Sequence, residues 1–128
     1  MKNRGMEINK LTGTILGCAF RVHTKLGPGL LESAYHRCLL YELGKAGLYV
    51  ESEVPLPIVY EGLRIERAFK VDLRIEQMVI AEIKAVEVIL PIHKAQLLSY
   101  LQLSGVRVGL LLNFNVAHLV DGITRMIR

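Results

Sequence analysis

The chain of 128 residues has no tryptophan, few aromatic residues (6%) and no apolar run of the roughly 18 residues that a membrane span needs. No membrane-spanning helix is therefore expected. Its two cysteines, Cys18 and Cys38, lack CxxC spacing and fall in segments with helical periodicity, which predicts reduced core thiols. No secretory signal is recognisable, so a cytoplasmic location with no membrane partner is expected.

Recognition motifs for nucleic-acid bases are also missing. The sequence has neither a helix-turn-helix nor a zinc-finger signature, and no run of aromatics that would form a stacking platform for single strands. The net charge of +4 favours a polyanionic partner only modestly. Hydrophobic residues make up 52% of the chain, and the surplus fits a core or an oligomer interface, so a homodimer is one alternative. The length predicts a single domain over residues 1–128.

Three stretches carry apolar residues at three- and four-residue spacing, which predicts three helices. Glycine and proline residues flank these stretches at positions that suit helix ends. The polar segment of residues 1–5, before the first stretch, is predicted to be frayed. The predicted helices cover residues 7–25, 30–46 and 92–104.

The remaining segments predict strands. Residues 106–113 are dense in aliphatic side chains, as in a strand buried on both faces, and the helix before them predicts a parallel crossover. Pro55 and Pro57 are expected to interrupt the first strand region, and turns are expected at Glu61–Gly62 and at Glu76–Gln77. The predicted strands cover residues 48–54, 58–60, 63–65, 69–75, 79–85, 106–113 and an edge strand within 119–127.

The central strand pair, FKVDLRIEQMVIAEIKA at residues 69–85, places charged residues inside apolar alternation. Glu82 and Lys84 share one face of the second strand, and pairing of the two strands brings Asp72 towards them. Aspartate is depleted from strands, and charged groups are rarely buried without a partner. The pattern fits either a metal site with a lysine beside it or the solvated outer face of an antiparallel hairpin.

Further candidates lie on the predicted helices. Glu32 is in a first helical turn, where the helix dipole favours a carboxylate whether or not it has a function, and Tyr35 is one turn further along the same face. Gln96 and Tyr100 are four residues apart and also share a face. The lone histidines, His23 and His36, suit surface or supporting roles better than metal ligation. Each of these residues has an ordinary structural explanation.

Five motifs in this order resemble the GxxExxY family of the PD-(D/E)XK nuclease superfamily. The resemblance covers nearly the whole chain, and the family's eponymous residues correspond to Gly29, Glu32 and Tyr35. An acid followed by E-x-K is a weak signal alone, whereas five ordered matches are much stronger. The motifs are LGPGLLESAY at residues 26–35, VDL at 71–73, AEIKA at 81–85, PIHKAQLLSY at 91–100 and GLLLNF at 109–114.

The resemblance implies an α/β fold with a restriction-endonuclease-like (PD-(D/E)XK) core, in which helices flank a mixed central sheet. It also implies Mg²⁺- or Mn²⁺-dependent hydrolysis of nucleic acid, DNA in preference to RNA. The small size leaves little room for specificity loops, so strong sequence specificity is not expected. An alternative is a catalytically silent relative that binds nucleic acid or a protein. The implied catalytic residues are Glu32, Asp72, Glu82 and Lys84, the implied metal ligands are Glu32, Asp72, Glu82 and the main-chain carbonyl of Ile83, and the implied supporting residues are Tyr35, Gln96 and Tyr100.

Converging carboxylates repel one another when no cation is present. We therefore expect at least one of the three acids to have a raised pKa in the metal-free protein.

Overall fold

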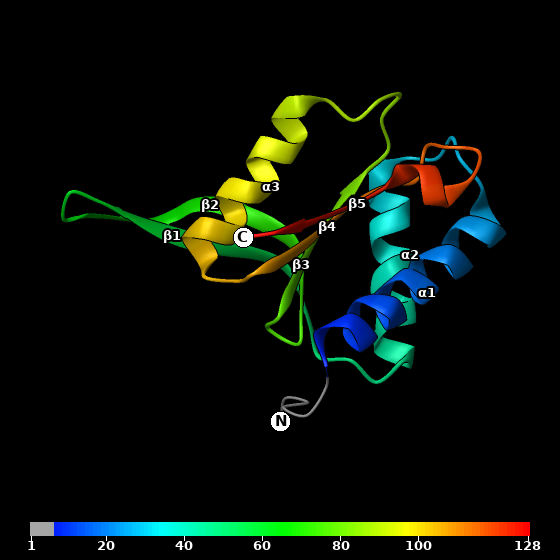
Figure 1. Ribbon diagram of the computed structural model, residues 1–128, viewed down its shortest axis with the longest axis horizontal. Coiled ribbons are helices and arrows are strands. Elements are labelled where there is room, and N and C mark those ends of the chain that lie inside the picture. The colour runs from blue at the N-terminus through cyan, green and yellow to red at the C-terminus, as the bar shows by residue number, and fades with distance from the viewer. Residues whose placement is uncertain (1–6) are drawn as a thin grey trace.

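The computed structural model describes residues 7–128 and shows one five-stranded sheet with helices on both faces (Figure 1). The segment predicted to be frayed, residues 1–5, lies outside the described residues. The strand order is β1-β2-β3-β4-β5, and only β3 and β4 run parallel. The elements are α1 (Ile8–Leu26), α2 (Glu32–Lys45), β1 (Val50–Tyr60), β2 (Leu63–Ile75), β3 (Val79–Lys84), α3 (Pro91–Ser104), β4 (Val108–Asn113), the 3₁₀ turn η1 (Leu119–Gly122) and β5 (Ile123–Ile127).

Two hydrophobic cores lie on opposite faces of the sheet. The first joins α1 and α2 to side chains of β2, β3 and β4, and the second joins α3 to the other face. Helix α3 approaches β4 so closely at Gly109 that a Cβ there would lie 2.9 Å from the Leu97 side chain. The second core consists of Val71, Ile80, Leu97, Leu101, Val106 and Leu111.

The helices begin and end within two residues of their predicted bounds. The Glu7 side chain accepts a hydrogen bond from the Asn9 N–H at 3.0 Å and caps α1. Pro91 stands at the start of α3, where its missing N–H costs nothing, and Gly105 ends the helix with a left-handed φ of +78°. The parallel β3-α3-β4 crossover is confirmed.

The predicted break at Pro55 and Pro57 is wrong, because β1 runs without interruption from Val50 to Tyr60. Strand β1 is an edge strand and pairs only with β2, so a proline can occupy a position whose missing N–H would have pointed away from the sheet. The register shifts between Leu56 and Ile58, on either side of Pro57. The segments predicted as separate strands at 63–65 and 69–75 likewise form one strand, β2.

The hairpin turn predicted at Glu61–Gly62 is confirmed, and the turn predicted at Glu76–Gln77 is present but also includes Met78. Glu61 and Gly62 connect β1 to β2 with φ values of +48° and +86°. Glu76 and Gln77 have φ values of +52° and +54°, and the Met78 N–H closes that turn by donating to the Ile75 carbonyl at 2.9 Å. Within residues 7–128, no helix has both the length and the apolar character required to cross a bilayer.

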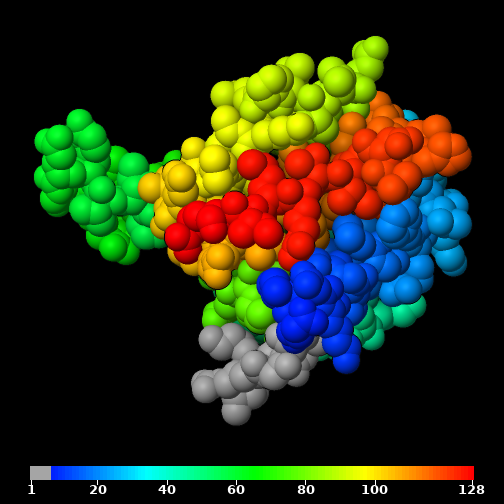
Figure 2. All heavy atoms as spheres, in the orientation of Figure 1, coloured from blue at the N-terminus to red at the C-terminus, as the bar shows by residue number. Residues whose placement is uncertain are grey.

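The outer part of the β1–β2 hairpin, residues 57–68, projects away from the rest of the molecule (Figure 2). We call this segment the arm. Its base is anchored, because Leu56 and Phe69 pack against the second core. Beyond these two residues the arm consists of only two strands.

Candidate functional site

Asp72 and Glu82 lie side by side where the pairing of β2 with β3 ends. The ladder is regular up to Leu73 opposite Ala81. At the next position, carboxyl side chains accept the hydrogen bonds that backbone carbonyl groups would accept in a continuous ladder. The Asp72 N–H donates to Glu82 Oε2 and the Ile83 N–H donates to Asp72 Oδ2, both at 2.8 Å. These two reciprocal hydrogen bonds fix both carboxyl groups, and the predicted convergence of the two acids is confirmed.

Glu82 is 5% exposed, and its environment raises the pKa of its carboxyl group from 4.5 to about 8. Burial is the main cause, and the charge of Asp72 is the second. The hydrogen bond from the Asp72 N–H and the charge of Lys84 lower the same pKa in part, while Glu32 raises it slightly further. The expectation of a raised carboxyl pKa is confirmed, although burial contributes more than repulsion.

The oxygen ligands offered by Asp72 and Glu82 fit a hard divalent cation. Each carboxyl group uses one oxygen in the reciprocal pair, and its other oxygen makes no hydrogen bond to the described part of the chain. Carboxylate and carbonyl oxygens are the ligands that Mg²⁺ and Mn²⁺ select. Within residues 7–128, however, no three acidic, histidine or cysteine side chains lie close enough together to form a complete metal cluster.

Glu32, the third candidate acid, begins α2 and faces the same cavity as Asp72. This cavity has a volume of about 440 Å³ and lies between α2 and the β1–β2 pair. Glu32 is exposed and is the weakest of the named influences on the Glu82 pKa, which places it outside the tight acidic pair. The cavity is lined by Glu32, Ser33, His36, Arg37, Glu53, Lys70 and Asp72.

Lys84 is half-buried at the end of β3, close enough for its charge to lower the pKa of Glu82. The backbone around it is held from β4. The Phe114 N–H donates to the Lys84 carbonyl at 2.9 Å, and buried Asn113 bonds Val86 twice, accepting from its N–H at 3.1 Å and donating to its carbonyl at 3.0 Å. Asn113 therefore fixes the path of the chain immediately after the candidate lysine.

Tyr35 is fully buried and does not reach the acidic pair. Its hydroxyl donates to the Gly27 carbonyl at 2.6 Å and accepts from the Leu30 N–H at 3.1 Å, and its ring stacks on Phe114 with centroids 4.8 Å apart. These bonds close the loop between α1 and α2, in which Gly29 adopts a φ of +99°. Tyr35 therefore fixes the loop that leads into α2, at whose start Glu32 stands.

Tyr35→Phe is expected to lower the free energy of unfolding by about 1–2 kcal/mol, because one substitution removes both hydroxyl hydrogen bonds from a buried position. Thermal unfolding followed by circular dichroism measures the loss. Tyr41→Phe is the matched control, because Tyr41 is 64% exposed. Equal melting temperatures for the two variants would contradict the anchoring role of the Tyr35 hydroxyl.

Of the remaining candidates, Tyr100 lies near the acidic pair. Its ring stacks on Phe69 with centroids 4.8 Å apart, and its phenol pKa is raised, mainly by burial and then by the charges of Glu82 and Asp72. Gln96 is exposed, and its side chain forms no hydrogen bond within residues 7–128. The structure thus brings Tyr100 towards the site and leaves Gln96 at the helix surface.

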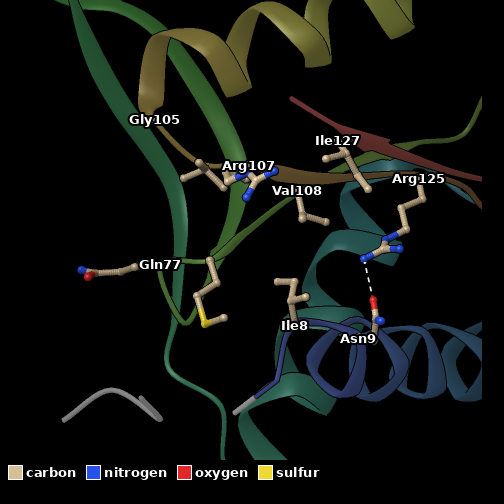
Figure 3. Close-up of a pocket in the computed structure, with 10 residues that line it drawn as sticks. Ile8, Asn9, Gln77, Gly105, Arg107, Val108, Arg125 and Ile127 are labelled. Carbon is tan, nitrogen blue, oxygen red and sulfur yellow. Dashed lines mark hydrogen bonds between the residues drawn. The ribbon is translucent and has the colours of Figure 1, made fainter. Parts of the chain in front are cut away.

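A larger cavity, of about 560 Å³, lies at the other end of β3, beside the β2–β3 turn (Figure 3). Its lining is apolar apart from two amides and two arginines, Arg107 and Arg125, and Arg125 donates to Asn9 Oδ1 at 2.9 Å. Among the residues that the structure describes, no carboxylate side chain lines it. This cavity therefore lacks the acidic groups found beside Asp72.

The sequence did not single out two contributors to the site. Arg37 lines the cavity beside Asp72, and Asn113 fixes the end of β3. Arg37 follows Glu32 by five residues, and only the packing of α2 over the sheet brings it to the cavity. Asn113 interrupts an aliphatic run, as Asp72 does, and a buried polar residue in such a run is a usable signal.

Comparison with known proteins gives one assignment. No curated protein and no solved structure matches the chain significantly. A family model described as the PD-(D/E)XK nuclease superfamily matches residues 9–126, which is almost the full length. The mixed sheet, the crossover helix and the paired Asp72 and Glu82 agree with that match. The chain belongs to the PD-(D/E)XK nuclease superfamily.

Proposed function

We propose that this protein is a metal-dependent nuclease that hydrolyses phosphodiester bonds of DNA in preference to RNA, without strong sequence specificity. The observation that carries the proposal is the pair of adjacent carboxyl groups of Asp72 and Glu82, held by the N–H groups of Ile83 and Asp72 beside Lys84, in a chain of a superfamily whose members are generally nucleases. Such an acidic pair, one member of which resists ionisation, is costly to the isolated protein and is explained by a cation that binds there.

Mg²⁺ or Mn²⁺ would be held by the free oxygens of Asp72 and Glu82 and by the Ile83 carbonyl, with Glu32 as an additional acid from α2. The ion would supply Lewis-acid chemistry, lowering the pKa of water and offsetting negative charge on the phosphate. The backbone N–H groups of Asp72 and Ile83 keep the two carboxyl groups in place before substrate arrives. This preorganisation means that little rearrangement is needed at the moment of reaction.

Lys84 is the group available for proton transfer or charge stabilisation. It lies within electrostatic range of Glu82, so its ammonium group can orient the attacking water or stabilise the charge that develops on the phosphate. Arg37 and Lys70 line the cavity beside Asp72 and would bind flanking phosphates. Lys70 also pairs with Glu53 at 3.2 Å, which holds it at the cavity wall. Side-chain contacts with the phosphates of DNA position a duplex without reading its sequence.

The test is incubation of the purified protein with plasmid, linear duplex, single-stranded DNA and RNA, each with Mg²⁺, with Mn²⁺ and with a chelator. We expect cleavage of DNA that requires the cation and is lost in Asp72→Asn. This variant keeps an acceptor for the Ile83 N–H, so it removes the charge while the reciprocal hydrogen bond can still form.

Asp121→Asn is the matched control, because Asp121 is the only other aspartate of the chain and lies on the surface of η1. It should cleave as the wild type does. Equal cleavage by the wild type and Asp72→Asn would contradict hydrolysis at this site. Absence of cleavage together with binding of nucleic acid would favour the silent, nucleic-acid-binding alternative.

A further inference from the structure

We propose that the apolar face of the arm is the surface through which two copies of this chain associate. The inference concerns a surface separate from the acidic pair and goes beyond the proposed hydrolysis. The arm projects from the molecule as an isolated two-stranded ribbon (Figures 1 and 2). Such a ribbon is at best marginally stable in water unless a third strand or another layer covers it.

One face of the arm is apolar towards its tip. Ile58 opposes Ile65 and Tyr60 opposes Leu63. Each strand contributes two of these residues, two positions apart, so the four side chains share a face of the arm beyond the register shift that separates it from Leu56 and Phe69. Leu56 and Phe69 pack on the second core, while towards the tip Ile65, Leu63 and Tyr60 are 40%, 60% and 62% exposed. The apolar side chains at the tip of the arm are therefore uncovered.

The same surface extends onto α3. Phe69 at the base of the arm stacks on Tyr100, and Leu103, one turn further along α3, is 53% exposed. An occupant that lies along the arm can therefore also cover part of α3. The combined surface exceeds the arm alone, which matters because a stable interface buries about 800 Å² on each partner.

The charge of the arm favours a second copy over nucleic acid. The arm carries two acids, Glu61 and Glu66, and two bases, Arg64 and Arg67, so its net charge is zero although the whole chain carries +4. Arg64 is already paired with Glu66, with Nε and Oε2 2.6 Å apart. A polyanion gains little from such a surface. Two positively charged copies repel each other least where each is neutral.

Two-fold symmetry makes the arm its own complement. In a symmetric pair the same patch serves both copies, so an apolar face meets an apolar face, and the mixed charges at its border can meet opposite charges. Each copy also contributes both its arm and the surface that receives the partner's arm. In such a dimer each arm is covered by the other copy, so the apolar side chains at both tips are removed from water.

Sedimentation of the full chain over a range of micromolar concentrations, without nucleic acid or added cation, tests the proposal. We expect a reversible dimer whose dissociation constant rises about tenfold or more in Leu63→Ser, because the variant loses one apolar side chain from each half of the interface. Val120→Ser is the matched control, since Val120 is 64% exposed in η1, away from the arm. Its dimer should be unchanged.

Photo-crosslinking gives a second readout that does not depend on weakening the interface. Benzoylphenylalanine in place of Tyr60 should yield a covalent dimer, and in place of Tyr41 it should not, although the two tyrosines are 62% and 64% exposed. A wild type that stays monomeric, or a dimer that Leu63→Ser leaves unchanged, would overturn the proposal. Crosslinking of position 60 to added duplex in place of a second chain would reassign the arm to nucleic acid. None of these outcomes bears on whether Asp72 is required for cleavage.

Discussion

Lys84→Met is expected to reduce the rate of metal-dependent DNA cleavage by about 10³-fold, the upper range for removal of one group that stabilises charge in a transition state. Methionine preserves an unbranched side chain of similar length at a half-buried position, so the substitution removes the charge and little else. Because the charge of Lys84 lowers the Glu82 pKa, its loss should also make Glu82 harder to ionise. Loss of charge stabilisation and weaker ionisation of Glu82 should both lower the cleavage rate.

Two further variants test whether a positive charge at residue 84 is sufficient and whether the loss of a lysine elsewhere has the same effect. Lys84→Arg keeps the positive charge but replaces a compact ammonium with a planar guanidinium, so it should recover only part of the activity. Lys94→Met removes an exposed lysine from α3 and should cleave as the wild type does. Initial cleavage rates on linear duplex, with circular dichroism as the check on folding, provide the comparison.

Calorimetric titration with Mn²⁺ distinguishes a catalytic lysine from one that only shapes the metal site. Loss of the Lys84 charge removes its repulsion of a bound cation but makes Glu82 harder to ionise, and because these two effects oppose each other, Mn²⁺ binding should change little while cleavage is lost. If Lys84→Met instead loses Mn²⁺ binding in proportion to activity, the lysine acts by organising the carboxyl groups and the direct catalytic role is wrong.

The sequence predicted the acidic pair because strand alternation is a local property. Asp72 and Glu82 each stand five residues from Gln77, the middle residue of the turn at residues 76–78, and the register that this turn sets brings them opposite each other. Strand alternation could not predict which groups donate hydrogen bonds to the two carboxyl groups. The two carboxyl groups accept from the backbone N–H groups of Asp72 and Ile83 where the ladder stops, so they sit between the strands and not on an outer face.

The stacking of Tyr35 on Phe114 and the hydrogen bonds of Asn113 depend on contacts that are distant in the sequence, whereas the Tyr35 hydroxyl bonds nearby Gly27 and Leu30. Tyr35 fixes the α1–α2 loop and stacks on Phe114, and Asn113 fixes the chain that leaves β3. Helix spacing places Tyr35 one turn after Glu32 but predicts neither its burial nor its partners. Packing of α2 over the sheet decides them. This packing also brings Arg37 to the cavity, and sequence spacing alone carried no signal for that placement.

The arm was not predicted, because the rule that proline interrupts a strand was applied without knowledge of the strand order. Prolines at 55 and 57 predicted a break, and in a central strand they would have caused one. At the edge of the sheet a continuous strand carries them, and Pro57 marks the start of the arm. An edge strand is recognised only once the strand order is known. The sequence therefore predicted the sheet and the crossover better than it predicted the longest hairpin.

Glu82→Gln is expected to stabilise the metal-free protein at alkaline pH while abolishing cleavage. The folded protein holds a proton on Glu82 up to about pH 8, whereas the unfolded carboxyl group releases it near 4.5. Wild-type stability should therefore decline as pH rises from about 4.5 to 8 and level off above 8. Glutamine keeps an acceptor for the Asp72 N–H without the charge. The variant should exceed the wild type by on the order of 5 kcal/mol at pH 9, and by little near pH 4.5.

Denaturant unfolding at the two pH values with a chelator measures this difference, and Glu87→Gln, at an exposed acid in the loop after β3, is the control expected to show none. Added Mg²⁺ or Mn²⁺ should then stabilise the wild type more than Glu82→Gln, since a cation that binds only the folded state offsets the cost of ionising Glu82. A variant less stable than the wild type at pH 9 would mean that the buried carboxylate has a stabilising partner. In that case the acidic pair would be a structural feature, and the inference from its cost to a cation site would no longer hold.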